Sequence, residues 1–238
     1  ALEQLYNALV SNNLGDFKQA TAQRHMDGGN VFYTDIKGNT FYSWWSRLME
    51  RSEQYDWLNA VDGSKRDSLY GGILAFDKMP QSENDSGSYY QASNTADWTV
   101  GDGAWGLNKD DFPNWLLTSP ERAFFPSRSQ RTVDLITGRP KHRLKDLLSW
   151  SLDTHIVAAE WVFPLIDRSY LEHGNGGEKS VDRAMTALQQ WQSDPRATKE
   201  SQGYSVYREW LVALAGITSK AAGGSLLNEV ADVRNTLP

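Results

Sequence analysis

The chain has 238 residues, a formal net charge of −6 at pH 7 and no cysteine. The negative charge argues against nonspecific nucleic-acid binding, which needs a basic face that releases phosphate counterions. The lack of cysteine excludes disulfides, thiolate metal sites and a cysteine nucleophile, and no apolar stretch approaches the roughly 20 residues of a membrane helix.

The first 45 residues predict two helices followed by a β-hairpin. Apolar residues near the start recur at i, i+3, i+4 and i+7, the spacing of an amphipathic helix: Leu2, Leu5, Tyr6 and Leu9. A second short helix should carry Phe17 and Ala20. Residues 31–34 and 40–45 are predicted strands, because Gly38 and Asn39 between them can adopt the positive φ of a hairpin turn.

A third strand is predicted over residues 88–93, in the same layer as the hairpin or next to it. Tyr89 and Gln91 alternate with Tyr90 and Ala92, which is the period of a strand. Asn94 follows where this strand should end. An asparagine there can form a turn, or its amide can donate a hydrogen bond to a ligand oxygen.

From Arg128 onward the pattern is helical. Leu144, Leu147 and Leu148 share one helix face, and Val157, Trp161 and Leu165 share another. Pro164 predicts a kink or a new helix start, and Gly174–Gly177 predicts a loop. Asp153, Ser180 and Ser201 are predicted to cap or open helices.

These elements indicate an α+β fold in one domain, with a mixed lobe over residues 1–120 and a mainly helical lobe over 121–238. Ten tryptophans and ten tyrosines stand out in the composition. Most should lie in the core, and others can line a pocket for an apolar ligand.

An ordered series of short motifs resembles the penicillin acylase family of N-terminal-nucleophile amidohydrolases, which includes the acyl-homoserine-lactone acylases. The resemblance extends to about Trp210. The matching pieces are the Leu2–Ala22 lead-in with Asp16-Phe17-Lys18, Asn30–Asp35, Lys37–Tyr42, Tyr55-Asp56-Trp57 with Val61-Asp62-Gly63, Gly87–Asn94, Asp111-Phe112-Pro113, Arg128 with Arg131, and Trp191 with Ser201-Gln202-Gly203.

The resemblance implies part of an αββα-type fold and an amide-hydrolysing activity on N-acyl compounds of the β-lactam or acyl-homoserine-lactone type. Family members attack with an N-terminal serine that uses its own α-amine as the base. Because this chain begins with Ala1, we expect an internal segment of the catalytic chain, inactive alone and completed by nucleophile-bearing and C-terminal parts. The family also favours a periplasmic or secreted location.

Two residues match catalytic positions of the family. Asn94 matches the asparagine that stabilises the oxyanion, although most members have a second asparagine where this chain has Thr95. Arg128 matches the arginine that orients the nucleophile amine, and an alignment shifted by three residues would select Arg131 instead.

No cofactor is required by this chemistry, although some members bind a structural calcium. Four aspartates could supply ligands for such an ion, or could serve turns and caps instead: Asp35, Asp62, Asp110 and Asp111. The rival function, from a different class, is a non-catalytic, aromatic-rich domain that binds a ligand or partner on the same scaffold.

Overall fold

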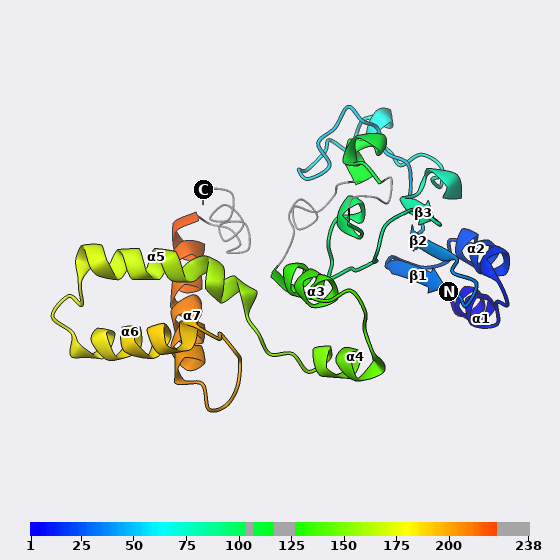
Figure 1. The fold of residues 1–238 in the computed structure, drawn as a ribbon. Helices are drawn as coiled ribbons and strands as arrows, with labels where there is room; N and C mark the ends of the chain where they lie inside the picture. Colours follow the sequence, from blue (N-terminus) through cyan, green and yellow to red (C-terminus); the bar gives the residue numbers. More distant parts are fainter. Residues whose placement is uncertain (103–106, 117–126, 223–238) are drawn as a thin grey trace. The chain divides into compact units, whose positions relative to one another are not determined.

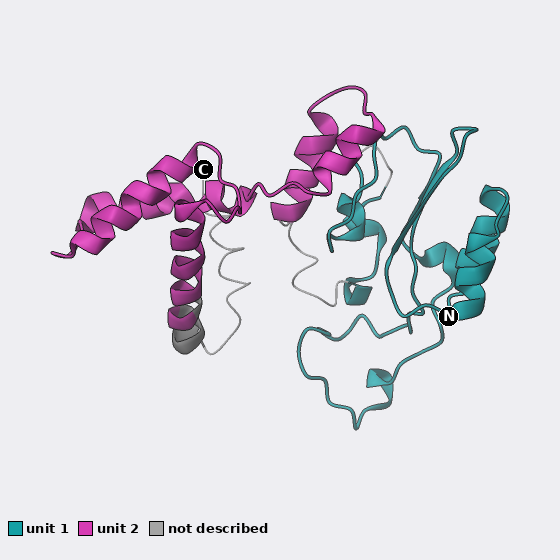
Figure 2. Cartoon of the chain, turned by 90° about the horizontal axis from the view of Figure 1, so that it is seen from below, with its two compact units in different colours: residues 1–126 teal, residues 127–238 magenta. Residues whose placement is uncertain are grey.

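The computed structural model describes residues 1–102, 107–116 and 127–222, which belong to two compact units, 1–126 and 127–238 (Figure 2). The first unit combines helices with a small sheet, and the described part of the second is helical (Figure 1). The predicted α+β class is therefore confirmed. No helix in the described ranges is long and apolar enough to cross a membrane.

Unit 1 opens with the two predicted helices and the predicted hairpin. Helix α1 spans Leu2–Leu9, and α2 spans Leu14–Ala22, where the side chain of Asn13 accepts a hydrogen bond from the backbone N–H of Asp16 at 3.0 Å. Strands β1 (Asn30–Thr34) and β2 (Thr40–Trp44) pair antiparallel. A third strand, β3 (Gln81–Glu83), pairs antiparallel with β2 and completes the order β1-β2-β3.

The two faces of this sheet have different neighbours. Tyr33 and Phe41 are directly opposite each other, so they share a face. The ring of Phe17 on α2 packs on that face, with its centroid 5.0 Å from Tyr33 and 6.5 Å from Phe41. Phe32 and Tyr42 share the other face, where Tyr90 packs at 5.7 and 5.9 Å. The segment that leads to Asn94 therefore lies on the sheet face opposite α2.

The predicted strand 88–93 is wrong. These residues have no strand pairing, and the third place in the sheet belongs to β3. Gln91 is buried, and its backbone N–H donates to the carbonyl of Val100 at 2.7 Å. The segment closes on the chain that follows it, although it does lie next to the hairpin as expected.

The rest of unit 1 is built from irregular chain and short 3₁₀ turns: η1 (Arg66–Ser68), η2 (Phe76–Lys78), η3 (Asp97–Thr99), η4 (Lys109–Asp111) and η5 (Asn114–Leu116). A small core gathers part of this chain against Trp44 at the end of β2. Its other buried members are Leu74, Met79, Trp115 and Leu116.

Unit 2 contains five helices in its described part: α3 (Ser127–Thr137), α4 (Leu144–Trp150), α5 (Val157–His173), α6 (Lys179–Gln192) and α7 (Gln202–Ala222). Helices α5 and α6 are joined by the predicted loop at Gly174–Gly177, and α7 crosses them (Figure 1). Pro164 lies inside α5, so it does not begin a new helix. The core between α5, α6 and α7 is built around Phe163, Trp191 and Tyr207.

Two of the predicted caps are wrong. Ser180 lies inside α6, which begins one residue earlier, and Asp153 lies four residues before α5. Asp153 instead forms ion pairs with the guanidinium groups of Arg131 and Arg196. The prediction for Ser201 is confirmed, because α7 begins at the next residue.

Candidate functional site

Asn94 lies where the chain reverses between the Tyr90 segment and η3. Its φ is +65°, in the left-handed region that asparagine adopts more readily than most residues. The residue is exposed, whereas Thr95, Ala96 and Asp97 immediately after it are buried. Asn94 therefore lies at the surface of unit 1, on a turn whose following residues are buried.

Hydrogen bonds fix the chain on both sides of Asn94. The buried side chain of Gln91 donates from Nε2 to the carbonyl of Thr99 at 3.0 Å. Thr99 in turn donates from its backbone N–H and its hydroxyl to the carbonyl of Ala96, at 2.9 and 2.7 Å. A side chain carried on such a closed turn needs little reorganisation before it binds a ligand.

An aromatic cluster supports the segment that precedes Asn94. The rings of Phe32, Tyr42 and Tyr90 lie within 5.9 Å of one another. Burial raises the pKa of Tyr90, and its hydroxyl lies 3.2 Å from that of Ser82 on β3. Phe32 is partly exposed, so the cluster also offers apolar surface on the face of the sheet that carries the Asn94 turn.

Two residues of this region were missed by the sequence analysis. The Tyr42 hydroxyl lies 2.8 Å from Oδ1 of the buried carboxylate of Asp97. The carboxylate three residues after Asn94 was a usable signal, because Asp commonly anchors turns. Nothing local in the sequence pairs it with a tyrosine 55 residues earlier.

The two candidate arginines differ in their surroundings within unit 2. Arg131 donates to both carboxylate oxygens of Asp153, from Nε and, at 3.1 Å, from an Nη nitrogen. The hydrogen bonds from Arg131 lower the pKa of Asp153. Arg128 is exposed in the first turn of α3. Both arginines line a cavity of about 350 Å³, together with Trp150 and His155.

Asn94 belongs to unit 1 and Arg128 to unit 2, and each is placed within its own unit. Each position suits a polar side chain that meets a ligand, since both residues are exposed.

None of the four candidate calcium ligands lies in a cluster of metal-binding side chains formed by the described residues. Across the described residues, no three His, Cys, Asp or Glu side chains gather closely enough to hold an ion. Asp35 accepts hydrogen bonds from Lys37, Asn39 and Tyr33, and the side-chain bond from Asn39 is the main cause of its lowered pKa. Asp62 accepts from Ser64 in the same way. These two carboxylates serve turns, which is the alternative that the sequence left open.

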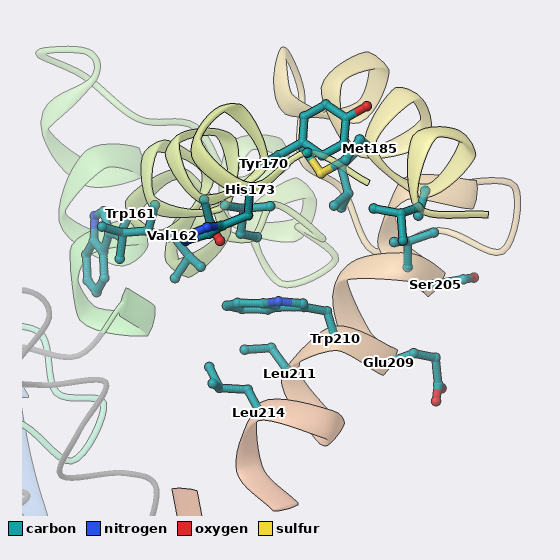
Figure 3. Close-up of a pocket in the computed structure, with 18 residues that line it drawn as sticks. Trp161, Val162, Tyr170, His173, Met185, Ser205, Glu209, Trp210, Leu211 and Leu214 are labelled. Carbon is teal, nitrogen blue, oxygen red and sulfur yellow. The ribbon is translucent and has the colours of Figure 1, made fainter. Parts of the chain in front are cut away.

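Unit 2 also contains an apolar groove of about 900 Å³ between α5, α6 and α7 (Figure 3). Its lining is mostly aliphatic and aromatic and includes Trp161, Val162, Met185, Leu211 and Leu214. The indole of Trp210 extends from α7 into the groove, and Leu211 and Leu214 follow it along the helix (Figure 3).

Comparison of this chain with known proteins identifies its family. A solved penicillin G acylase from Alcaligenes faecalis shares the fold, with a TM-score of 0.53 and 15% sequence identity. The match covers 84% of this chain and 33% of that one, so the chain spans a third of the length of the acylase. The family profile described as penicillin amidase matches residues 1–236. That match spans nearly the whole sequence, and the chain belongs to the penicillin amidase family.

Proposed function

We propose that this chain is the part of a penicillin-acylase-type amidohydrolase that supplies the oxyanion donor and a surface for the acyl group. The reaction is the hydrolysis of the amide bond in an N-acyl compound, of the β-lactam or acyl-homoserine-lactone type. Because the chain spans a third of the acylase that it resembles, we assign the nucleophile to another part of a longer protein.

The observation that carries the proposal is the presentation of Asn94. Attack on an amide carbonyl creates a negatively charged oxygen, and a donor that is already in place stabilises it without reorganising during the reaction. The Nδ2 group of an exposed asparagine on a turn closed by Gln91 and Thr99 meets that requirement. A flexible surface asparagine would not.

Arg128 is the better candidate for the arginine that holds the nucleophile. A guanidinium has five N–H donors in a rigid fork, so it can bind several groups at once. Arg131 uses two of its nitrogens on Asp153, which is mostly buried. Arg128 is exposed in the first turn of α3.

The acyl group would pack against the aromatic cluster near the Asn94 turn. Phe32 and Tyr90 offer partly exposed rings there, and aromatic surfaces favour apolar or aromatic acyl chains. The sheet provides a rigid support for this surface.

The proposal is tested by incubating the full-length protein with a panel of N-acyl amides and identifying the products by mass spectrometry. We expect stoichiometric release of a carboxylic acid and an amine from substrates with apolar acyl groups. Hydrolysis at the β-lactam ring or the lactone ring, with the amide intact, would contradict the proposal.

The groove in unit 2 favours a second candidate function, the binding of an apolar ligand without turnover. If this is the function, an environment-sensitive apolar fluorophore should bind stoichiometrically, and Trp210→Ala should abolish binding. Trp57→Ala, in unit 1, is the matched control. Amide hydrolysis should then be absent and Asn94→Ala without effect.

A further inference from the structure

We propose that Tyr42 and Asp97 form a positioning pair that sets the geometry of the Asn94 turn. This inference rests on the proposed role of Asn94 as the oxyanion donor. Neither residue would touch the substrate, and both would act through the turn that carries Asn94.

The pair joins the middle strand of the sheet to the turn. Tyr42 lies on β2 and is fully buried, and Asp97 is the first residue of η3, three residues after Asn94. The phenol oxygen lies 2.8 Å from Oδ1 of Asp97. The ring of Tyr42 also packs 5.9 Å from that of Tyr90, four residues before Asn94. One side chain of the sheet therefore contacts the chain on both sides of the turn.

Asn30 provides a second acceptor near the Tyr42 hydroxyl. Its side-chain Oδ1 lies 2.7 Å from the same phenol oxygen of Tyr42. A phenol has one proton, and a carboxylate is a stronger acceptor than an amide oxygen. The proton of Tyr42 therefore favours Asp97, and Oδ1 of Asn30 is the second acceptor beside the same hydroxyl.

The chemistry of the pair is suited to holding a position rather than to reacting. The hydrogen bond is buried, where a charge-assisted bond is stronger than in water. Asp97 belongs to the same turn as Thr99, whose bonds to Ala96 close it. A shift of Asp97 would move this closure and with it the direction of the Asn94 amide. Displacements of about 1 Å at a catalytic group can cost about 10²-fold in rate.

The test compares Tyr42→Phe with wild type in the full-length enzyme. Removing only the phenol oxygen should lower kcat by about tenfold, as expected for the loss of one hydrogen bond that orients a catalytic group, and leave KM within about twofold. Tyr33→Phe is the matched control, because the Tyr33 hydroxyl also binds an aspartate, Asp35 at 3.0 Å, but in the hairpin turn. The control should keep kcat within about twofold of wild type.

A double-mutant cycle separates positioning from general stability. In an Asn94→Ala background, Tyr42→Phe should change kcat by less than about twofold, because the group that it positions is gone. Any loss of thermal stability should persist in both backgrounds. A tenfold loss that remains in the Asn94→Ala background would overturn the inference, and so would unchanged kcat in folded Tyr42→Phe.

Asp97→Asn keeps the test decisive if Tyr42→Phe does not fold. This isosteric change retains an acceptor for the Tyr42 proton, so an intermediate loss of about two- to fivefold in kcat is expected, again absent without Asn94. An unchanged kcat in Asp97→Asn would then count against the pair. Failure of the proposed function is distinguishable, because in that case Asn94→Ala itself would have near-normal kcat.

Discussion

Replacing Arg131 by alanine should destabilise the protein, whereas replacing the exposed Arg183 on α6 should not. Asp153 is 9% exposed, and the Arg131 side chain paired with it is 25% exposed. After the change Asp153 would keep the ion pair with Arg196, at 3.4 Å and 43% exposed, and a hydrogen bond from the backbone of His155. Breaking a buried pair costs about 3–5 kcal/mol and breaking an exposed pair about 0–1 kcal/mol. For this partly buried pair we expect a loss of about 2 kcal/mol in the free energy of unfolding at pH 7.

The same change should also alter the acid dependence of stability. Arg131 lowers the pKa of Asp153 in the folded state. The stability from this carboxylate is therefore present above its unfolded pKa of about 3.9 and is lost as pH falls through the lower folded value. The difference between wild type and Arg131→Ala should thus be largest near neutral pH and shrink in acid.

Urea unfolding followed by tryptophan fluorescence, at pH 7 and at about pH 3, measures both effects. Arg183→Ala, which removes an exposed arginine from α6, is the control and should stay within about 0.5 kcal/mol of wild type. Equal stabilities of the two arginine variants at pH 7 would refute this reasoning about Asp153. So would a difference that stays constant into acid.

Three further changes test the packing. Gly203→Ala should lower the free energy of unfolding in urea by about 3 kcal/mol, because an added Cβ would lie 2.3 Å from Cβ of Trp191. The control is Gly216→Ala on the same helix. Its added Cβ would meet nothing within 4 Å, so this variant should be neutral or stabilising. Burial raises the pKa of Tyr207 to about 12. The free energy of unfolding should therefore fall by roughly 2 kcal/mol as pH rises from about 10 to 12, because the folded state favours the neutral phenol. Comparison with Tyr207→Phe over that pH range isolates this contribution. Gln4→Ala should lower the midpoint of thermal unfolding, through a loss of about 2 kcal/mol in the free energy of unfolding. The buried Gln4 side chain donates to the carbonyl of Thr21 at 2.9 Å and accepts from the N–H of His25 at 2.7 Å. Wild-type stability in this variant would show that water replaces both bonds.

The elements predicted correctly depend on local chemistry. The hairpin combines two strand-like runs with Gly38, whose φ is +85°. The strand pattern and the turn glycine are both local features, so the sequence alone predicts the hairpin. The α1 helix follows from its apolar spacing, but that spacing does not say which side is covered. In unit 1 the buried residue of α1 is Gln4, while Leu2 and Leu9 are 84% and 83% exposed. Burial of Gln4 follows from partners 17 and 21 residues away, which no local pattern contains.

The errors arise where distant partners compete with local preference. Residues 88–93 alternate like a strand, yet the edge of β2 is paired with Gln81–Glu83. Asp153 has a side chain that can cap a helix, but a carboxylate can equally form an ion pair, and here it pairs with Arg131, 22 residues away. A turn at Asn94 was one of the two alternatives that the sequence left open. The link from this turn to Tyr42 through Asp97 depends on a contact across 55 residues.

The central claim is that Asn94 stabilises the oxyanion, and kinetics of Asn94→Ala in the full-length enzyme test it most directly. If the claim is correct, kcat for an N-acyl amide should fall by about 10²–10³, the cost of one oxyanion donor, with KM little changed because the charge forms mainly in the transition state. If Asn94 only forms the turn, the variant should instead lose about 1 kcal/mol of stability and keep a near-normal kcat, which would contradict the account.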